Sequence, residues 1–261
     1  MKNVLLMAML AVTSWCGAQS FEGGVFFGGS VYSGDLSPKV IPRYFNFMNP
    51  VGTVSLRMEN GGVVGARANF SYTKLEGDDA RSAHPSRKLA FNTRLIEASV
   101  LAEWFLVRDN FLGDRQPVTP YLYGGISVFH FSPETTMDGE LIDLHALGSE
   151  GQGLEGFEDP YSKTQIAIPL GLGFRFQISR RSNLNVQIGT RKLFTDYLDD
   201  VSGEVLDFYR IVEEKGPEAA RVSRPDVDVE SGNFSRFFRR GGERYDGFIM
   251  MQVGFMTKLG Y

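Results

Sequence analysis

His130, Ser132 and Glu134 are the residues of this sequence whose types come closest to a catalytic set. They are spaced two apart, so they share one face of a strand that runs through them. A histidine beside a serine can activate the hydroxyl as a nucleophile when a carboxylate orients the imidazole. Three residues along one straight strand rarely converge, however, and Ser132-Pro133 predicts the end of the strand. We therefore expect an interfacial histidine and a loop-starting serine, with a hydrolase as the alternative.

Two further patterns are typical of ligand sites. Asp196, Asp199 and Asp200 cluster within one segment, and carboxylates of this kind can hold Ca²⁺. Their spacing is not that of an EF-hand loop, and turn formation explains them equally well, so Ca²⁺ binding stays open. Residues 151–156 match G-x-G-x-x-G but lie outside any strand–turn–helix unit, which predicts a flexible loop and no dinucleotide site. We expect no cofactor.

Composition narrows the class of protein that could carry these residues. The chain has 261 residues, of which 43% are hydrophobic and 22% charged, as in a folded protein. A formal net charge of −4 argues against nucleic-acid binding, which needs a basic surface. Past the N-terminus no apolar run reaches about 18 residues, so transmembrane helices are excluded. A membrane β-barrel is not excluded, because its strands alternate in hydropathy.

The N-terminus has the pattern of a secretory signal peptide. A short positive start precedes the apolar residues 4–12, which are too few to span a membrane. Cys16-Gly17-Ala18 places small residues before Gln19, where we expect cleavage. The alternative is a lipoprotein acylated at Cys16, which Trp15 fits poorly. The expected organisation is a signal peptide over residues 1–18 and an outer-membrane β-barrel over residues 19–261.

Alternation of apolar and polar residues with period two runs through most of the chain. In residues 166–177, six apolar side chains from Ile166 to Phe176 share one face, and small or polar residues share the other. Seven other segments behave similarly: residues 21–32, 51–59, 63–73, 93–106, 121–131, 183–193 and 248–261. Eight strands of this length suit a tilted membrane strand, and an even number closes an antiparallel barrel. The fold prediction is all-β, an eight-stranded antiparallel transmembrane β-barrel.

Connection lengths alternate along the predicted strands. The connections after the second and sixth strands are short and the one after the fourth has about a dozen residues, whereas those after the first, third, fifth and seventh are long. Outer-membrane barrels show this asymmetry, with short periplasmic turns and long extracellular loops.

The inward faces of the predicted strands carry charges of both signs. An eight-stranded barrel has room inside for little more than its own side chains. Charges buried there must be paired or hydrogen-bonded. We therefore predict an arginine–glutamate network that plugs the lumen, with a gated pore or proton path as the alternative. The residues concerned are Arg57, Arg67, Arg175, Arg191, Glu22, Glu59, Glu97 and Glu103.

Several stretches, in this order, resemble the PorG-like outer-membrane proteins of the type IX secretion machinery of Bacteroidota. They are residues 29–36, 70–79, 120–125, 147–154, 168–173 and 194–202, which together span most of the predicted barrel. The resemblance implies a non-enzymatic barrel in the outer membrane. It further implies contact with a periplasmic ring formed by a lipoprotein and its soluble partner. It transfers no catalytic residue, and a relative with another role stays open.

Contact with periplasmic partners would use the turns and termini at one end of the barrel. The largest of these turns surrounds residues 108–115, and we predict partner contacts at Arg108, Asp109, Asn110, Phe111, Asp114 and Arg115. Outer-membrane lipid and lipopolysaccharide are the other expected partners. Arginines such as Arg239 and Arg240 in the fourth long loop can pair with lipopolysaccharide phosphates or form a solvated face. The functional alternatives are an outer-leaflet lipid A hydrolase using His130 and Ser132, and a narrow transport barrel.

Overall fold

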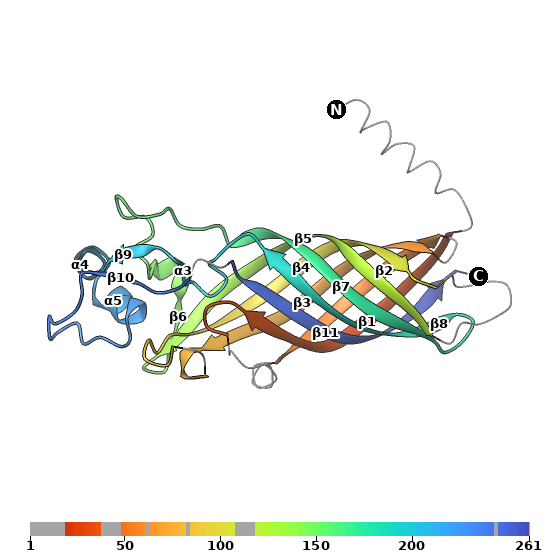
Figure 1. The fold of residues 1–261 in the computed structure, drawn as a ribbon, viewed down its shortest axis with the longest axis horizontal. Coiled ribbons are helices and arrows are strands. Elements are labelled where there is room, and N and C mark those ends of the chain that lie inside the picture. The colour runs from red at the N-terminus through yellow and green to blue at the C-terminus, as the bar shows by residue number, and fades with distance from the viewer. Residues whose placement is uncertain are drawn as a thin grey trace, which may run out of the picture.

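Eight antiparallel strands close into a barrel in the computed structural model, which describes residues 19–37, 48–60, 63–81, 84–107, 118–242 and 245–260. Each strand pairs with the next barrel strand in the chain, and β1 pairs with β11, so the ring has no free edge (Figure 1). The predicted fold is confirmed. The barrel strands are β1 (Gln19–Ser33), β2 (Asn49–Asn60), β3 (Val64–Asp78), β4 (Ala90–Phe105), β5 (Val118–Met137), β7 (Thr164–Gln177), β8 (Ser182–Leu193) and β11 (Gly247–Leu259).

The outer surface of the barrel is apolar because alternate residues of every strand point outward. Apolar side chains from all eight strands are exposed there: Phe27, Val54, Phe70, Val100, Ile126, Ile166, Ile188 and Val253 are examples. Their neighbours in sequence point inward and are mostly buried polar or charged residues. A closed barrel with an apolar exterior satisfies every strand edge internally, which is what a hydrocarbon environment requires. No helix in the described part of the chain is long and apolar enough to cross a membrane.

The two ends of the barrel are built differently. The connections from β2 to β3, from β4 to β5 and from β7 to β8 start and finish at one end of the barrel, where β1 begins and β11 finishes. The long connections lie at the other end (Figure 1). We call the described parts of the loops after β1, β5 and β8 the extracellular cap (residues 34–37, 138–163, 194–242 and 245–246). The cap holds β6 (Glu140–Asp143), α3 (Leu144–Leu147), β9 (Val205–Asp207), α4 (Phe208–Arg210), η3 (Ile211–Lys215), α5 (Pro217–Ser223) and β10 (Phe237–Arg239). The short η2 (Asp79–Arg81) lies in the loop after β3.

The structure corrects the expectation that β5 ends at Ser132-Pro133. β5 continues to Met137, where it forms a hairpin with β6. Its ladder with β7 stops at His130, and its ladder with β6 starts at Glu134. Pro133 lies between the two ladders, so the N–H that proline lacks is not needed there.

A smaller difference concerns the outer face of β1 near the cap. The alternation predicts that Val31 faces outward like Phe27, yet Val31 is buried while Phe27 is exposed. Met48 lies against Gly29, two residues before Val31 on the same face. The outside of this strand is therefore covered by protein where it approaches the first loop.

A charge placed on the lipid-facing band tests the membrane orientation of the barrel. Ile126, at the middle of β5, is 67% exposed on the outside. We expect Ile126→Arg to lower the free energy of unfolding by about 2–4 kcal/mol, because a guanidinium at the bilayer midplane is poorly solvated. The measurement is urea unfolding in lipid vesicles. Leu141→Arg is the matched control, since Leu141 is 60% exposed in β6, beyond the barrel; equal losses in both variants would contradict the orientation.

Candidate functional site

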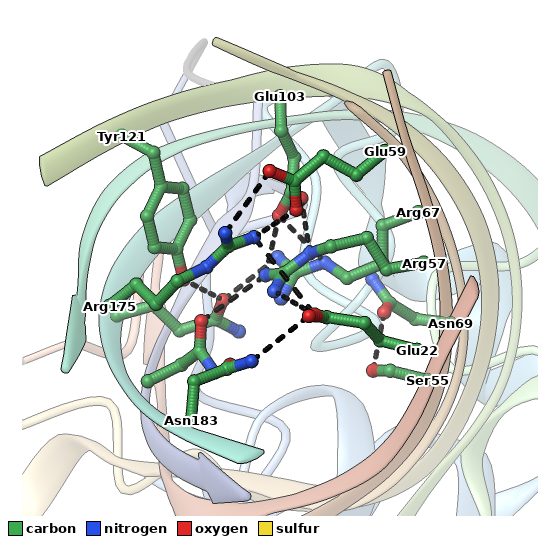
Figure 2. A network of polar contacts seen from close by, with 12 residues as sticks. Glu22, Ser55, Arg57, Glu59, Arg67, Asn69, Glu103, Tyr121, Arg175 and Asn183 are labelled. Carbon is green, nitrogen blue, oxygen red and sulfur yellow. Dashed lines mark hydrogen bonds and ion pairs between the residues drawn. The ribbon is translucent and has the colours of Figure 1, made fainter. Parts of the chain in front are cut away.

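The lumen of the barrel is filled by a network of buried arginines and glutamates. Figure 2 looks along the barrel and shows these side chains reaching toward one another from opposite walls. They converge because inward positions on β1, β2, β3, β4 and β7 carry charges, while the outward neighbours are apolar. The predicted arginine–glutamate network is confirmed in the structure.

Arg57 lies at the centre of this network and is fully buried. Its Nε donates to Glu103 Oε2 at 2.6 Å, and its Nη1 donates to Glu22 Oε2 at 3.1 Å. A further hydrogen bond reaches Asn185 Oδ1 at 3.2 Å. A buried guanidinium with two carboxylates and an amide around it has its charge compensated and its donors used. Arg57 therefore ties β2 to β1, β4 and β8 across the lumen.

Three other arginines extend the network along the barrel. Arg175 Nη2 lies 2.7 Å from Glu59 Oε2, and Arg67 Nε lies 3.1 Å from Glu103 Oε1. Arg191 Nη2 lies 3.3 Å from Glu97 Oε2. These residues are all buried, so water neither screens nor replaces the pairs. All four arginines and all four glutamates named from the sequence are joined in ion pairs.

Aromatic rings close the gaps between the charged groups. The Arg175 guanidinium lies 4.2 Å from the centre of the Phe105 ring, and that of Arg67 lies 5.1 Å from the Phe26 ring. Rings at this distance attract a cation and exclude water from the space around it. The inward residues named from the sequence do not include Phe26, because it is an apolar residue on an otherwise polar face. The alternation could have identified it, since its neighbours Val25 and Phe27 face outward and Phe26 must therefore face inward.

The extracellular cap is fastened to the barrel mouth by buried carboxyl groups. Tyr32 Oη, at the end of β1, lies 2.5 Å from Asp199 Oδ2 and 2.7 Å from Asp246 Oδ1. A phenol carries one proton, so one of these two contacts needs a proton on the carboxyl group. Burial, together with the nearby Asp246, raises the pKa of Asp199 well above its ordinary value. Burial likewise raises the pKa of Asp246. The raised pKa values of the two acids favour the proton that the second contact with Tyr32 needs.

A second buried cluster in the cap surrounds Arg240. Its Nη1 donates to Ser149 Oγ at 2.7 Å and to the Asp200 carbonyl at 2.8 Å, and lies 3.3 Å from Glu150 Oε1. Glu150 also accepts from the Ser202 backbone N–H and hydroxyl, at 2.9 and 2.6 Å. Burial raises the pKa of Glu150 to about 7, although Arg240 opposes the shift. These contacts join the loop after β5 to the loop after β8.

Two of the three aspartates considered for Ca²⁺ have protein partners in the structure. Asp200 accepts from the hydroxyls of Ser149 and Tyr161, and Asp199 accepts from Tyr32 and the Val201 N–H. The third, Asp196, has one carboxylate oxygen that is buried without a partner among the described residues. Within the described ranges, no three histidine, cysteine, aspartate or glutamate side chains come together as a metal site.

The glycines of residues 151–156 belong to an ordered part of the cap. Gly151, Gly153 and Gly156 have φ near +83°, which side-chain-bearing residues rarely adopt. Between them Gln152 is buried against the Glu150 backbone. This segment is a series of tight turns, which corrects the expectation of a flexible loop.

The histidine–serine–glutamate set does not form a catalytic arrangement. His130 Nδ1 contacts Thr164 Oγ1 at 3.1 Å on the outside of the barrel. Glu134 instead pairs with Arg94 at 2.5 Å, and the Ser132 N–H donates to Thr93. The three residues thus have different partners on the neighbouring strands and do not converge on one another, as expected for residues spaced along one strand.

Two sets of sequence predictions lie outside the described residues. One is the signal peptide over residues 1–18. The other is the partner-contact set in the turn after β4, which comprises Arg108, Asp109, Asn110, Phe111, Asp114 and Arg115.

Loss of the central arginine should destabilise the barrel strongly. Arg57→Met would leave Glu22 and Glu103 buried without their main partner. Because Arg67 still contacts Glu103, we expect a loss near the low end of the range for broken buried pairs, about 3 kcal/mol. Urea unfolding in vesicles measures it. Arg94→Met is the control, since this arginine is half exposed and its pair contributes about 0–1 kcal/mol. A loss for Arg57→Met no larger than the control would contradict the role of the network.

The cap should loosen as the pH rises toward neutrality. In the folded chain Glu150 keeps its proton up to a pKa of about 7, whereas its ordinary value is 4.5. The folded state therefore binds more protons than the unfolded state between these values. Its stability is present at low pH and is lost as the pH rises through this window. Hydrogen exchange of residues 196–203, corrected for its intrinsic pH dependence, should show faster opening at about pH 8 than at about pH 5.

Glu150→Gln should reduce this pH dependence, because it removes one of the titrating groups of the cap while Asp199 and Asp246 remain. Glu155→Gln in the same loop should keep it, because Glu155 is exposed. If the unmodified protein exchanges identically at both pH values, this would count against a stabilising proton on Glu150 in the cap.

The chain is similar to one protein family in sequence and to several solved structures in fold. Residues 1–211 match a family described as a domain of unknown function, DUF6089. Curated proteins provide no match. Solved structures that are similar include Neisserial surface protein A, with 12% identity, coverage of 93% of this chain and 99% of that chain, and a TM-score of 0.46. A major outer membrane protein from Thermus thermophilus is 11% identical, with coverage of 93% of this chain and 100% of that chain, and a TM-score of 0.44.

A third similar structure is Ail, the attachment invasion locus protein of Yersinia pestis, in complex with the heparin analogue sucrose octasulfate. It is 10% identical, with coverage of 91% of this chain and 98% of that chain, and a TM-score of 0.41. At these identities the likenesses concern the fold alone. The match over residues 1–211 covers most of the 261 residues, and the chain therefore belongs to the DUF6089 family.

Proposed function

We propose that this protein is a non-enzymatic outer-membrane β-barrel that serves as an anchoring component of the type IX protein secretion machinery. On its periplasmic side it contacts the ring formed by a lipoprotein and its soluble partner. A signal peptide over residues 1–18 delivers it to the periplasm, from which it inserts into the outer membrane. The secretion role rests on the sequence resemblance, and the described structure supports the anchoring part of the proposal.

The observation that carries the anchoring role is the filled lumen. Arg57 and Arg175 are buried among glutamates and aromatic rings that reach across the barrel. A barrel whose interior is occupied by its own ion-paired side chains is suited to holding a position in the membrane rather than to conduction. Its interactions with other molecules then depend on its two ends and its outer wall.

Three of the six stretches that carry the resemblance meet in space. Residues 29–36, 147–154 and 194–202 meet at the extracellular mouth through Tyr32 with Asp199 and through Ser149 with Asp200. Segments distant in sequence are thus joined by buried hydrogen bonds, and these three stretches form one connected part of the barrel mouth.

The periplasmic end of the barrel carries the short connections, the start of β1 and the end of β11. The longest connection there is residues 106–117, between β4 and β5. It contains the predicted contact residues Arg108, Asp109, Asn110, Phe111, Asp114 and Arg115, of which four are charged. Charged groups at the edge of an interface mainly set the specificity and rate of association. We propose that this turn docks on the periplasmic ring.

Deletion of the gene tests the secretion role. We expect type IX cargo to disappear from the medium and to accumulate in the periplasm, because an anchor of the export machinery is missing. Quantitative mass spectrometry of both fractions measures this, and a plasmid copy should restore export. Normal export after deletion would contradict the assignment.

The turn itself is tested by replacing residues 108–115 with glycine and serine in the full-length protein. The barrel should still fold, while recovery of the ring proteins in a pull-down should fall. The same replacement over residues 226–233, in the cap, is the control and should leave recovery unchanged. Ring recovery that survives the first replacement would move the contact elsewhere. Sustained open events in a planar bilayer would contradict the plugged anchor.

A further inference from the structure

Four arginines line a small cavity in the extracellular part of the protein. It lies between the loop after β3 and the second half of the loop after β8, next to α5 and β10. Its lining consists of Arg87, Arg224, Arg239 and Arg240 together with Leu89, Ser223, Asp226 and Phe238. Its volume is about 100 Å³. This is room for about three water molecules, or for one small tetrahedral anion.

Three hydrogen-bond donors of the lining residues have no partner among the described residues. They are Ser223 Oγ, Arg224 Nη1 and Arg240 Nε. Ser223 is 1% exposed and Arg240 is 4% exposed, so bulk water does not replace the missing partners. A buried donor without an acceptor is costly, and native structures rarely leave several in one place. A ligand that supplies several acceptors at this cavity would satisfy all three.

The guanidinium groups around the cavity are held in place from outside it. Arg87 makes two contacts to the Asp79 carboxylate, at 3.0 and 2.7 Å, and its Nη1 also donates to the Arg240 carbonyl. Arg240 is fixed by Ser149, Glu150 and Asp200 on its Nη1 side. These acidic partners fix the two arginines while the Nε of Arg240 stays unused. The positions of the charges are therefore set before any ligand arrives.

Arg224 is held by aromatic rings as well as by a carboxylate. Its guanidinium lies 5.0 Å from the centre of the Phe238 ring and 5.5 Å from that of Phe208. Its Nη2 contacts Asp226 at 3.1 Å. Rings stacked near a guanidinium fix its plane and leave its N–H edge for other partners. Nη1 on that edge is the unpartnered donor.

We propose that this arginine cavity binds a phosphate group. Arginine is the preferred residue for phosphate recognition, because its planar fork matches two oxygens at once and its charge does not titrate away. A phosphate group offers several acceptor oxygens in different directions, which matches two guanidiniums and a hydroxyl belonging to different parts of the loop. The one carboxylate that lines the cavity, Asp226, is engaged with Arg224. The inference is independent of the secretion role.

The extracellular position of the cavity allows two sources of the same chemistry. One is a phosphate carried by lipid A in the outer leaflet, and the other is free phosphate or a phosphorylated solute. Both would meet the same donors, so the chemistry of the site is common to them. The tests below separate the sources after establishing the site.

The first test is isothermal titration of the full-length barrel, folded in detergent micelles, with inorganic phosphate. We expect saturable binding at one site per barrel. Arg224→Gln should weaken it about tenfold or more, because it removes a charged donor from the cavity. Ser223→Ala, which changes no charge and only one atom, should also weaken it measurably.

Arg221→Gln is the matched control. Arg221 lies on α5, which ends directly before Arg224, and its replacement loses the same charge, but its side chain is half exposed and pairs with Asp138. It should leave phosphate affinity within about twofold, since only screened long-range attraction is lost. Absence of saturable binding to the unmodified protein would overturn the proposal. So would equal weakening by Arg221→Gln and Arg224→Gln, or unchanged affinity in both cavity variants.

The second test compares vesicles containing lipid A with its phosphates and vesicles containing dephosphorylated lipid A. A preference for the phosphorylated lipid that Arg224→Gln removes and Arg221→Gln retains assigns the site to the lipid. Equal behaviour of the two vesicle types, together with binding of inorganic phosphate, assigns it to a soluble phosphate group. Phosphorylated lipid that binds equally well to both variants would show contact elsewhere and count against this cavity as the lipid site.

Discussion

Compensation of charge inside a narrow, closed barrel is the constraint on which the rest of the structure depends. Half of the residues of each strand must face inward, and the lumen of eight strands leaves no space for bulk water. Arg57, on β2, can exist there only because Glu22 approaches it from β1 and Glu103 from β4. The same requirement places Arg175 beside Glu59. The network therefore stabilises the barrel only as a whole.

Buried charges in the extracellular cap are compensated differently from those in the lumen. Acidic groups outnumber arginines around Tyr32, so proton sharing between Asp199 and Asp246 replaces ion pairing. Farther out the balance reverses, and the cavity near α5 gathers arginines with donors to spare. Within the membrane, charges are thus compensated by ion pairs. At the barrel mouth, carboxyl groups share a proton, and in the outer loops the arginine cavity leaves donors for an anion. The way in which charge is compensated in each region therefore follows that region's access to water.

Most of the barrel follows from the sequence, and the exceptions have identifiable causes. Period-two alternation located all eight strands, and the alternating connection lengths identified their two ends. The sequence predicts the end of a strand at Ser132-Pro133, whereas in the structure Pro133 lies between two ladders, where the N–H that proline lacks has no partner to meet. The burial of Val31 and the tight turns of residues 151–156 depend on how the long loops fold back, and local patterns do not predict such contacts.

The sequence by itself determined which side chains face the lumen and that opposite charges would have to meet there. Only the tertiary structure decided that Arg57 pairs with Glu22 and Glu103, or that Arg175 pairs with Glu59, more than a hundred residues away. The same is true of the cap, where Tyr32 meets Asp199 and Asp246. Alternation is a property of each strand and can be deduced locally. Partner choice depends on how the strands are staggered around the closed ring and on how the loops return to its mouth, which no single segment specifies.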